Sequence, residues 1–330
     1  MRNLQDATER ICELKGSLVA LDALAAAMLH MQTDEQRSRL LPIFERHAEV
    51  ARAVLINTPI SEHTIAAFES GVARSVALIG GARATREVVE PMLLTTVHIS
   101  TFDGQRALTG ASGFFFERDE RMFLVTSRHV VFDEPTGHRP DRIEIALHTD
   151  ARNLTSWTGM SILLYRKGLA DWRQANDTGG PIDVAVLELD RSSLPQTAVL
   201  HAFTPEHVQA SQSGVEAGRS VSIVGFPMGF HDTLHHLPVV RQAAIASSFG
   251  LRFQGRGFFL TDARMHRGSS GAPVLMRTPS AAQLPGALPW ALLGVHSSRF
   301  DMGNRDKNED ESLGLNCAWY ADVLLALTAG

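Results

Sequence analysis

The sequence predicts an α+β, multidomain chain, with an N-terminal helical bundle over residues 1–88 and a β-rich domain over residues 89–330. Only Gly16 and Gly71 of the 26 glycines precede residue 80, and glycine-poor sequence favours long helices. Apolar residues of the first part recur three and four positions apart, which is the period of one helix face. Later, short runs rich in β-branched and aromatic residues alternate with Gly, Pro, Asp or Asn, which predicts strands and turns.

Three apolar seams predict three helices in the first part. The first seam runs from Leu4 to Met28 with coiled-coil spacing. Thr33 and Gln36 have the spacing of a capping box and predict the start of the second helix. The third helix is expected to begin at Pro59, because proline is favoured at the first helical position. The expected buried faces are Leu41, Phe44, Ala48, Ala51 and Leu55 in the second helix and Ile65, Phe68, Val72, Val76 and Ile79 in the third.

Short strands without intervening helices predict a barrel or sandwich in the second part. Residues 133–182 hold few apolar residues and are expected to include long surface loops, and Ala318–Leu327 is expected to form a C-terminal helix. The expected strands are Leu93–Ser100, Gly113–Glu117, Met122–Thr126, Arg142–His148, Val184–Leu189, Ser220–Val224, Arg252–Thr261, Ala272–Met276 and Leu292–His296.

Composition excludes several classes of protein. With 44% hydrophobic and 20% charged residues the chain is typical of a globular protein. A net charge of -5 without a basic stripe argues against a nucleic-acid partner, and no apolar run is long enough to predict a membrane partner. Cys12 and Cys317 are too few for a disulfide framework or a four-thiolate zinc site. The N-terminal residues lack the pattern of a secretory signal, so we expect a cytoplasmic protein, with export by a signal-less secretion system left open.

Three short motifs of the β-rich part carry residues of one chemistry. His129 ends an apolar strand, Asp183 opens another, and Ser270 lies in the small-residue loop Gly268–Val274. Each motif alone has an ordinary structural explanation. Together they supply a hydroxyl nucleophile, an imidazole to accept its proton and a carboxylate to fix the imidazole tautomer. The backbone N–H groups of Gly268 and Ser270 are the candidate oxyanion hole.

These motifs and their order resemble the chymotrypsin-fold (trypsin-like) serine peptidases, most closely their bacterial HtrA-type branch. The resemblance covers about residues 90–330 and implies a double six-stranded β-barrel of chymotrypsin type with the site between the barrels. It also implies His129 as general base, Asp183 as orienting carboxylate and Ser270 as nucleophile. The segments that carry the likeness are Gly110–Phe114, Val224–Gly229, Thr261–Ala263 and Gly268–Pro273.

The sequence departs from this family in two ways. Ala272 stands where the family usually has a second glycine after the serine, and we expect crowding there rather than inactivation. The helical part precedes the barrels, and we expect no PDZ domain after them. The helical part is either a packed accessory domain or an interaction module that binds a regulatory protein or a second copy through residues 1–80.

The resemblance places Arg264 at the base of the pocket that selects substrate. Its guanidinium there would prefer an acidic residue by charge pairing. The alternative is that Arg264 faces solvent and that Val295, His296 and Ser297 shape the pocket. The sequence therefore does not decide between these two arrangements, and so it does not predict which residue is preferred before the cleaved bond.

Other chemistry is less well supported. His231, His235 and His236 cluster with one acid, Asp232, which is a weak zinc signal, and we expect them at the rim of the substrate cleft. Cys317 is expected to pack as a small hydrophobe, and residues 301–311 form a charged stretch expected to be a solvated loop.

The sequence thus predicts a serine endopeptidase that hydrolyses peptide bonds of protein or peptide substrates through an acyl-enzyme on Ser270, with no metal or other cofactor. The alternative is a non-catalytic or partner-activated peptide-binding scaffold with the helical part as adaptor.

Overall fold

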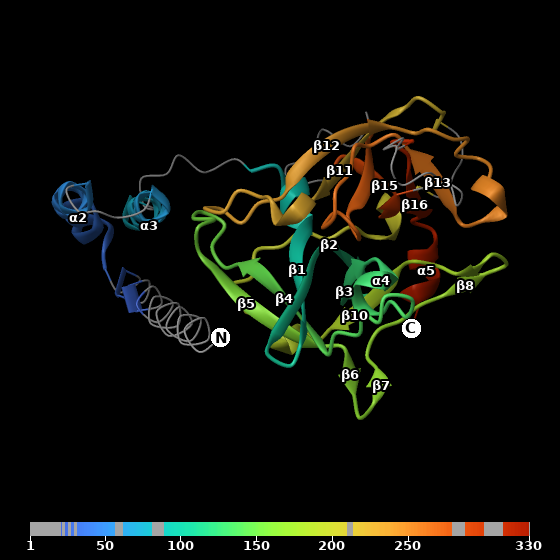
Figure 1. Ribbon diagram of the computed structural model, residues 1–330, viewed down its shortest axis with the longest axis horizontal. Helices are drawn as coiled ribbons and strands as arrows, with labels where there is room; N and C mark the ends of the chain where they lie inside the picture. Colours follow the sequence, from blue (N-terminus) through green and yellow to red (C-terminus); the bar gives the residue numbers. More distant parts are fainter. Residues whose placement is uncertain are drawn as a thin grey trace. The chain divides into compact units, whose positions relative to one another are not determined.

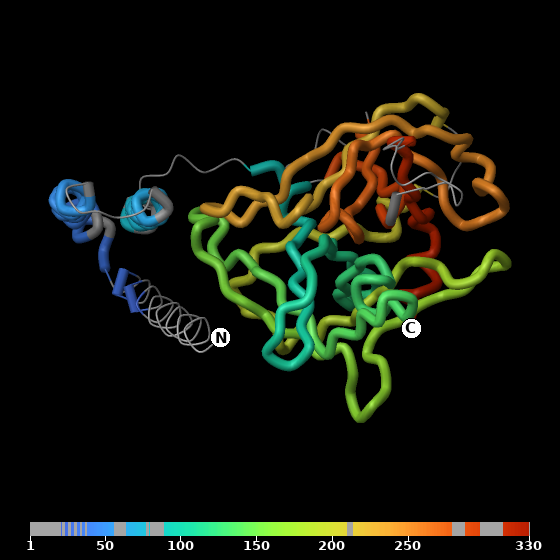
Figure 2. Tube along the Cα trace, in the orientation of Figure 1, coloured from blue at the N-terminus to red at the C-terminus, as the bar shows by residue number. Residues whose placement is uncertain are grey.

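The structure is a computed structural model that describes residues 21, 24, 25, 28, 29, 32–56, 62–80, 89–209, 214–278, 288–299 and 313–329. It divides into two compact units (Figures 1 and 2). The first contains residues 1–87 with 152–156, and the second contains residues 88–151 with 157–330.

The first unit contains helices α2 (Asp34–Ile56) and α3 (Glu62–Gly80). The expected capping box is confirmed, because Thr33 N donates to Gln36 Oε1 at 2.9 Å and Gln36 N to Thr33 Oγ1 at 3.3 Å. The two faces predicted from apolar spacing are the less exposed faces of these helices. Arg52 on α2 makes a two-pronged ion pair with Glu69 on α3 (2.6 and 2.8 Å), which joins the two helices.

Most of the predicted first seam, and the predicted start of the third helix at Pro59, lie outside the described residues. The described seam residues Leu21 and Met28 are exposed, as is Leu24 beside them. A complete helical bundle in this unit therefore stays a prediction.

The second unit is built on two six-stranded antiparallel sheets. The first has the strand order β10-β3-β2-β1-β4-β5, and the second has the order β12-β11-β14-β15-β16-β13. The strands of the first sheet are β1 (Thr96–Asp103), β2 (Arg106–Arg118), β3 (Arg121–Thr126), β4 (Arg142–His148), β5 (Trp157–Leu163) and β10 (Ala185–Leu189). Those of the second are β11 (Ser220–Gly225), β12 (Val239–Ala244), β13 (Phe258–Thr261), β14 (Pro273–Arg277), β15 (Trp290–Arg299) and β16 (Asn316–Tyr320).

Shorter elements connect these strands. Two small hairpins project between β5 and β10, and a single helical turn, α4, follows β3. The second sheet closes toward a barrel, because a bridge joins Ile245, just beyond β12, to Thr261 on β13. The short elements are α4 (Arg128–Val131), α5 (Val323–Leu327), β6 (Tyr165–Arg166), β7 (Leu169–Ala170), β8 (Asn176–Asp177) and β9 (Gly180–Pro181).

Three apolar clusters hold this unit together. One lies within the first sheet, around Ile99 and Leu124, and one within the second, around Ile223 and Val274. The third contains residues of both sheets, so the sheets are joined by a continuous core. Its first-sheet members include Phe114, Phe116, Phe123, Val125 and Val186, and its second-sheet members include Val224, Leu275, Val295 and Trp319.

Three expectations about secondary structure are wrong in detail. The strand expected over Arg252–Thr261 begins only at Phe258, because Phe253–Gly255 forms a 3-10 turn. Residues 318–320 are not helical but complete β16, and only Val323–Leu327 forms the expected C-terminal helix. The region expected to hold long loops contains β5, an edge strand whose residues alternate between exposed and half-buried. An edge strand with one face open to solvent needs few apolar residues, so its sequence resembles that of a loop.

Candidate active site

Strand pairing in the first sheet brings His129 and Asp183 together. His129 lies on α4, three residues after Thr126 ends β3, and Asp183 lies two residues before β10 begins. β10 pairs with β3 so that Ala185 faces Thr126. The Asp183 carboxylate then accepts from the backbone N–H of His129 at 2.8 Å and lies 2.7 Å from its Nδ1. Since a carboxylate oxygen accepts, Nδ1 carries a proton and Nε2 of the neutral ring is left as an acceptor.

The two half-buried groups stabilise each other's charged forms. Burial lowers the pKa of His129, but the hydrogen bond and charge of Asp183 outweigh it, and the pKa lies above the usual histidine value. Burial likewise raises the pKa of Asp183, but hydrogen bonds from His129 and Ser297 outweigh it, and the pKa lies below the usual aspartate value. The arrangement therefore keeps an anion beside an imidazole that readily accepts a proton.

Ser297 has a different position from the one expected for a pocket residue. Its hydroxyl donates to Asp183 Oδ2, and its side chain is buried. Its backbone carbonyl accepts a hydrogen bond from Ser270 Oγ at 3.1 Å. Ser297 thus contacts the orienting carboxylate with its side chain and the candidate nucleophile with its backbone, and it supports the site rather than lining an open pocket.

Ser270 lies in the loop between β13 and β14, in the second sheet. Its carbonyl accepts from Ser112 N of the first sheet at 2.9 Å, which fixes the loop across the two sheets. The next residue has to be glycine, because Gly271 has φ +86° and a Cβ there would lie 2.1 Å from the Ser112 carbonyl oxygen. In the described part of the chain no hydrogen bond joins Ser270 Oγ to His129, and the Ser270 hydroxyl instead donates to Ser297 O.

The two expected oxyanion donors are the backbone N–H groups of Gly268 and Ser270. Among the described residues, neither Gly268 N nor Ser270 N donates a hydrogen bond. The Arg267 carbonyl accepts from Met228 N at 2.5 Å. Because the C=O and N–H of a trans peptide point in opposite directions, this contact turns the Gly268 N–H away from Met228. Gly268 itself has φ +91°, and a Cβ there would lie 2.5 Å from the Phe226 carbonyl oxygen.

Ser112 connects this loop to its neighbours. Its buried hydroxyl donates to the Gly268 carbonyl at 2.8 Å and accepts from Phe226 N at 2.9 Å. Ser112 lies in a motif that carries the resemblance, but its role depends on cross-sheet contacts that sequence spacing does not reveal.

The remaining pocket residues do not form an open pocket with their side chains in the described structure. Arg264 is exposed and makes no hydrogen bond or ion pair with any described residue. Val295 is fully buried in the core shared by the two sheets. His296 is also buried, its Nδ1 has no hydrogen-bond partner among the described residues, and burial together with the nearby charge of His129 lowers its pKa to about 4.

Ala272 is fully buried, as expected for the position after Ser270 and Gly271. Its methyl group is accommodated at Gly225, where an added Cβ would lie 3.1 Å from Ala272 Cβ and 2.7 Å from Ser112 Oγ. The crowding expected from Ala272 is therefore met by a glycine on the facing strand.

Two other expectations concern metals and thiols. No group of three or more His, Cys, Asp or Glu residues is placed to hold a metal ion within the described ranges. Cys317 packs in the shared core on β16, where burial raises the pKa of its thiol to about 11.

No described helix is long and apolar enough to cross a membrane. Residues 301–311 lie outside the described residues.

Comparison with known proteins gives a family match but no curated relative. The model of the trypsin-like peptidase domain matches residues 111–279, just over half of the chain. No curated protein matches.

Solved structures similar to this chain include a serine endoprotease from Yersinia pestis, at 16% identity and TM-score 0.41. The match covers 72% of this chain and 62% of the Yersinia chain. Others are the scabies mite inactivated protease paralogue S-I1, at 16% identity and TM-score 0.43 (72% and 92% covered), and human heparin binding protein, at 17% identity and TM-score 0.43 (73% and 96% covered). This chain thus spans less than two thirds of the Yersinia protein. On the strength of the family match, the chain belongs to the trypsin-like peptidase family.

Proposed function

We propose that the protein is a serine endopeptidase in which Ser270 is the nucleophile, His129 the general base and Asp183 the orienting carboxylate. The observation that supports this most strongly is the geometry around His129. Its Nδ1 is hydrogen-bonded to the half-buried carboxylate of Asp183, while two backbone N–H groups on the serine loop have no protein partner among the described residues. Such groups are what acyl transfer through a tetrahedral intermediate requires.

The proposed reaction begins when the Ser270 side chain rotates away from Ser297 O toward His129. Nε2 of His129 takes the hydroxyl proton as Oγ bonds to the scissile carbonyl carbon. The oxyanion that forms accepts hydrogen bonds from Gly268 N and Ser270 N. The C–N bond then breaks, and His129 passes its proton to the leaving amine. Water next attacks the acyl-enzyme, with His129 again accepting the proton, and releases the acid and Ser270.

The finer parts of the assignment are also proposals. We place the chain closest to the HtrA-type branch on the motifs quoted above, with a cytoplasmic location supported by the low cysteine count. A preference for an acidic residue before the cleaved bond rests on the charge of Arg264 alone, because this side chain is exposed, as in the alternative that has it facing solvent. A peptide library cleaved equally well after Leu, Ala and Glu would exclude that preference.

Labelling with a fluorophosphonate probe tests the proposed function. The unmodified protein should label, and both Ser270→Ala and His129→Ala should abolish labelling. The exposed Ser161 provides a matched serine control, and Ser161→Ala should label at the normal rate. Labelling that survives Ser270→Ala would show that another serine is the nucleophile.

A second candidate is a peptidase activated by a partner, with the helical unit as adaptor. The hydrogen bond from Ser270 Oγ to Ser297 O favours it, because the hydroxyl points to a backbone carbonyl rather than to its base. This candidate predicts slow labelling of the isolated protein and faster labelling when a ligand of the helical unit is added. A protein that never labels would favour a peptide-binding scaffold.

A further inference from the structure

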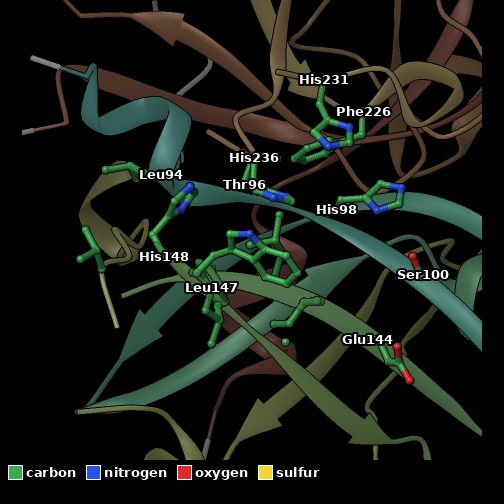
Figure 3. A pocket seen from close by; sticks show the side chains of 17 residues that line it. Leu94, Thr96, His98, Ser100, Glu144, Leu147, His148, Phe226, His231 and His236 are labelled. Carbon is green, nitrogen blue, oxygen red and sulfur yellow. The ribbon is translucent and has the colours of Figure 1, made fainter. Parts of the chain in front are cut away.

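A pocket of about 290 Å³ lies on the outer face of the first sheet, under the loop that follows β11 (Figure 3). Its floor contains two small residues, because Ala146 on β4 faces Gly159 on β5. The next pair on the same face of these strands is His148 and Trp157, which form one wall. A volume of this size suits a single side chain or a small fragment rather than a large ligand. We call it the histidine pocket.

Aromatic rings enclose most of the histidine pocket. The Phe226 ring packs against His98 and His231, with centroid distances of 5.2 and 5.6 Å. Trp157 packs against His236 at 4.4 Å. Figure 3 shows His98, His231 and His236 converging from β1 and the overlying loop. The faces of such rings attract cations, because their π-electrons are negative.

The imidazoles of this pocket are hydrogen-bond acceptors in their neutral form. His231 Nδ1 lies 2.6 Å from the Gly229 carbonyl, and His148 Nε2 lies 2.6 Å from the His235 carbonyl. A carbonyl oxygen only accepts, so these nitrogens carry the protons, and His231 Nε2 and His148 Nδ1 present lone pairs. Neither ring nitrogen of His98 has a hydrogen-bond partner among the described residues.

Two of the pocket imidazoles, those of His98 and His148, carry no charge at neutral pH. Burial lowers the pKa of His98, assisted by the nearby His231, and burial lowers the pKa of His148. Both rings are therefore neutral. Glu144 also lines the pocket and is held by Arg142 at 3.1 Å. Glu144 is thus already paired, and the neutral acceptors and the aromatic face of Trp157 are the groups suited to a hydrogen-bond donor that carries positive charge.

We propose that the histidine pocket binds a guanidinium or ammonium group, supplied by an arginine or lysine of the protein substrate on the leaving-group side of the scissile bond. This proposal rests on the proposed peptidase function. The cation would stack on the exposed ring of Trp157 and donate to His231 Nε2 and His148 Nδ1.

The pocket adjoins the nucleophile loop through two contacts. Phe226, part of its roof, is hydrogen-bonded through Ser112 to the Gly268 carbonyl. Met228, two residues on, donates to the Arg267 carbonyl. The loop after β11 thus contacts the oxyanion segment at Gly268, whereas Ser297 contacts Ser270. The proposal therefore assigns the Gly268 side of Ser270, which the pocket adjoins, to the substrate residues after the bond.

Gly159 offers a clean way to fill the pocket. An added Cβ there would have no atom within 4 Å, and the backbone is not in the left-handed region. Valine also suits a strand, so Gly159→Val should fold and block the pocket. Ser161→Val is the matched control, because Ser161 is exposed two residues along β5 and does not line the pocket. His231→Phe keeps a ring on Phe226 but removes the acceptor Nε2, and serves as an independent variant.

Binding is measured on full-length Ser270→Ala protein by NMR of the histidine ring signals, titrated with N-acetyl-arginine amide. A fragment of this size should bind with Kd of about 1 mM and shift the signals of His98 and His231. The citrulline, norleucine and glutamate analogues should bind at least about tenfold more weakly, because they lack the cation. Gly159→Val and His231→Phe should weaken binding by at least about tenfold, and Ser161→Val should not. Equal binding of arginine and citrulline, tighter binding of glutamate, or no shift at all would overturn the proposal.

Cleavage of a proteome-derived peptide library by the unmodified protein identifies the source of the cation. Enrichment of Arg or Lys after the cleaved bond, lost in Gly159→Val but kept in Ser161→Val, supports a substrate side chain. Arginine binding without enrichment would overturn the substrate assignment and indicate a free small cation. If the histidine signals shift but no variant cleaves peptides or labels with fluorophosphonate, the proposed function fails while the cation site stands. Cleavage of peptides without any shift of the histidine signals and without enrichment would overturn the cation site, while the proposed function stands.

Discussion

The Ser112 hydroxyl is the contact whose removal should be most informative. It is fully buried and satisfies two buried backbone groups at once, the Gly268 carbonyl and the Phe226 N–H. Ser112→Ala leaves both groups without a partner. Each buried unsatisfied group costs about 1–3 kcal/mol, so the free energy of unfolding should fall by about 2–6 kcal/mol. The cavity left by one oxygen is too small to change this range.

Urea denaturation of Ser112→Ala measures this fall in the free energy of unfolding. The control is Ser161→Ala at an exposed position, which should change the free energy of unfolding by less than about 0.5 kcal/mol. Gly268 would also lose an anchor of the oxyanion loop. The rate constant for fluorophosphonate labelling should therefore fall by about tenfold or more in the variant that is still folded. A loss of stability below about 0.5 kcal/mol would refute the reasoning that this hydroxyl ties the two sheets together at the site.

Four further outcomes are expected. Gly268→Ala should abolish labelling while the protein stays folded by circular dichroism, since a Cβ would lie 2.5 Å from the Phe226 carbonyl; normal labelling would contradict the oxyanion assignment. The labelling rate should rise with pH and reach half its maximum above the usual histidine value of about 6.5, because the raised pKa of His129 keeps the base protonated to higher pH; a half-maximum below 6 would contradict it. Ser297→Ala should reduce the labelling rate by about tenfold and raise the pKa of Asp183. The low pKa of Asp183 stabilises the fold at neutral pH, and this contribution is lost as the pH falls through that pKa. The free energy of unfolding of the variant should therefore begin to fall at a higher pH than that of the unmodified protein. Deleting residues 1–80 should lower the oligomer mass in light scattering and leave a folded peptidase unit; an unchanged mass would exclude self-association through this part.

The fold was predictable where one residue pattern decides the structure. β4 spans the predicted residues, and the capping box at Thr33 is present, because alternation and capping are local properties. β5 and β16 were missed for a physical reason. The first is an edge strand with an open face, and the second is defined by its partners β13 and β15 rather than by its own sequence.

The site shows the same division. The pairing of His129 with Asp183 agrees with the roles that the resemblance of the motifs and their order implies for these two residues. The contacts of Ser297 and Ser112 could not be predicted, since both cross from one sheet to the other and depend on how the sheets pack. The side-chain direction of Val295 likewise follows from the shared core rather than from its distance along the chain to Ser270.

The accommodation of Ala272 by Gly225 has a consequence for how this sequence can vary. A side chain at Gly225 would meet Ala272 and Ser112 together, so replacement of Gly225 by a larger residue is constrained by both of them. A lineage could restore glycine at 272 freely, yet it could gain a methyl group at 225 only after both partners had become smaller. Natural variants of this chain should therefore change these three positions in a fixed order, and never position 225 first.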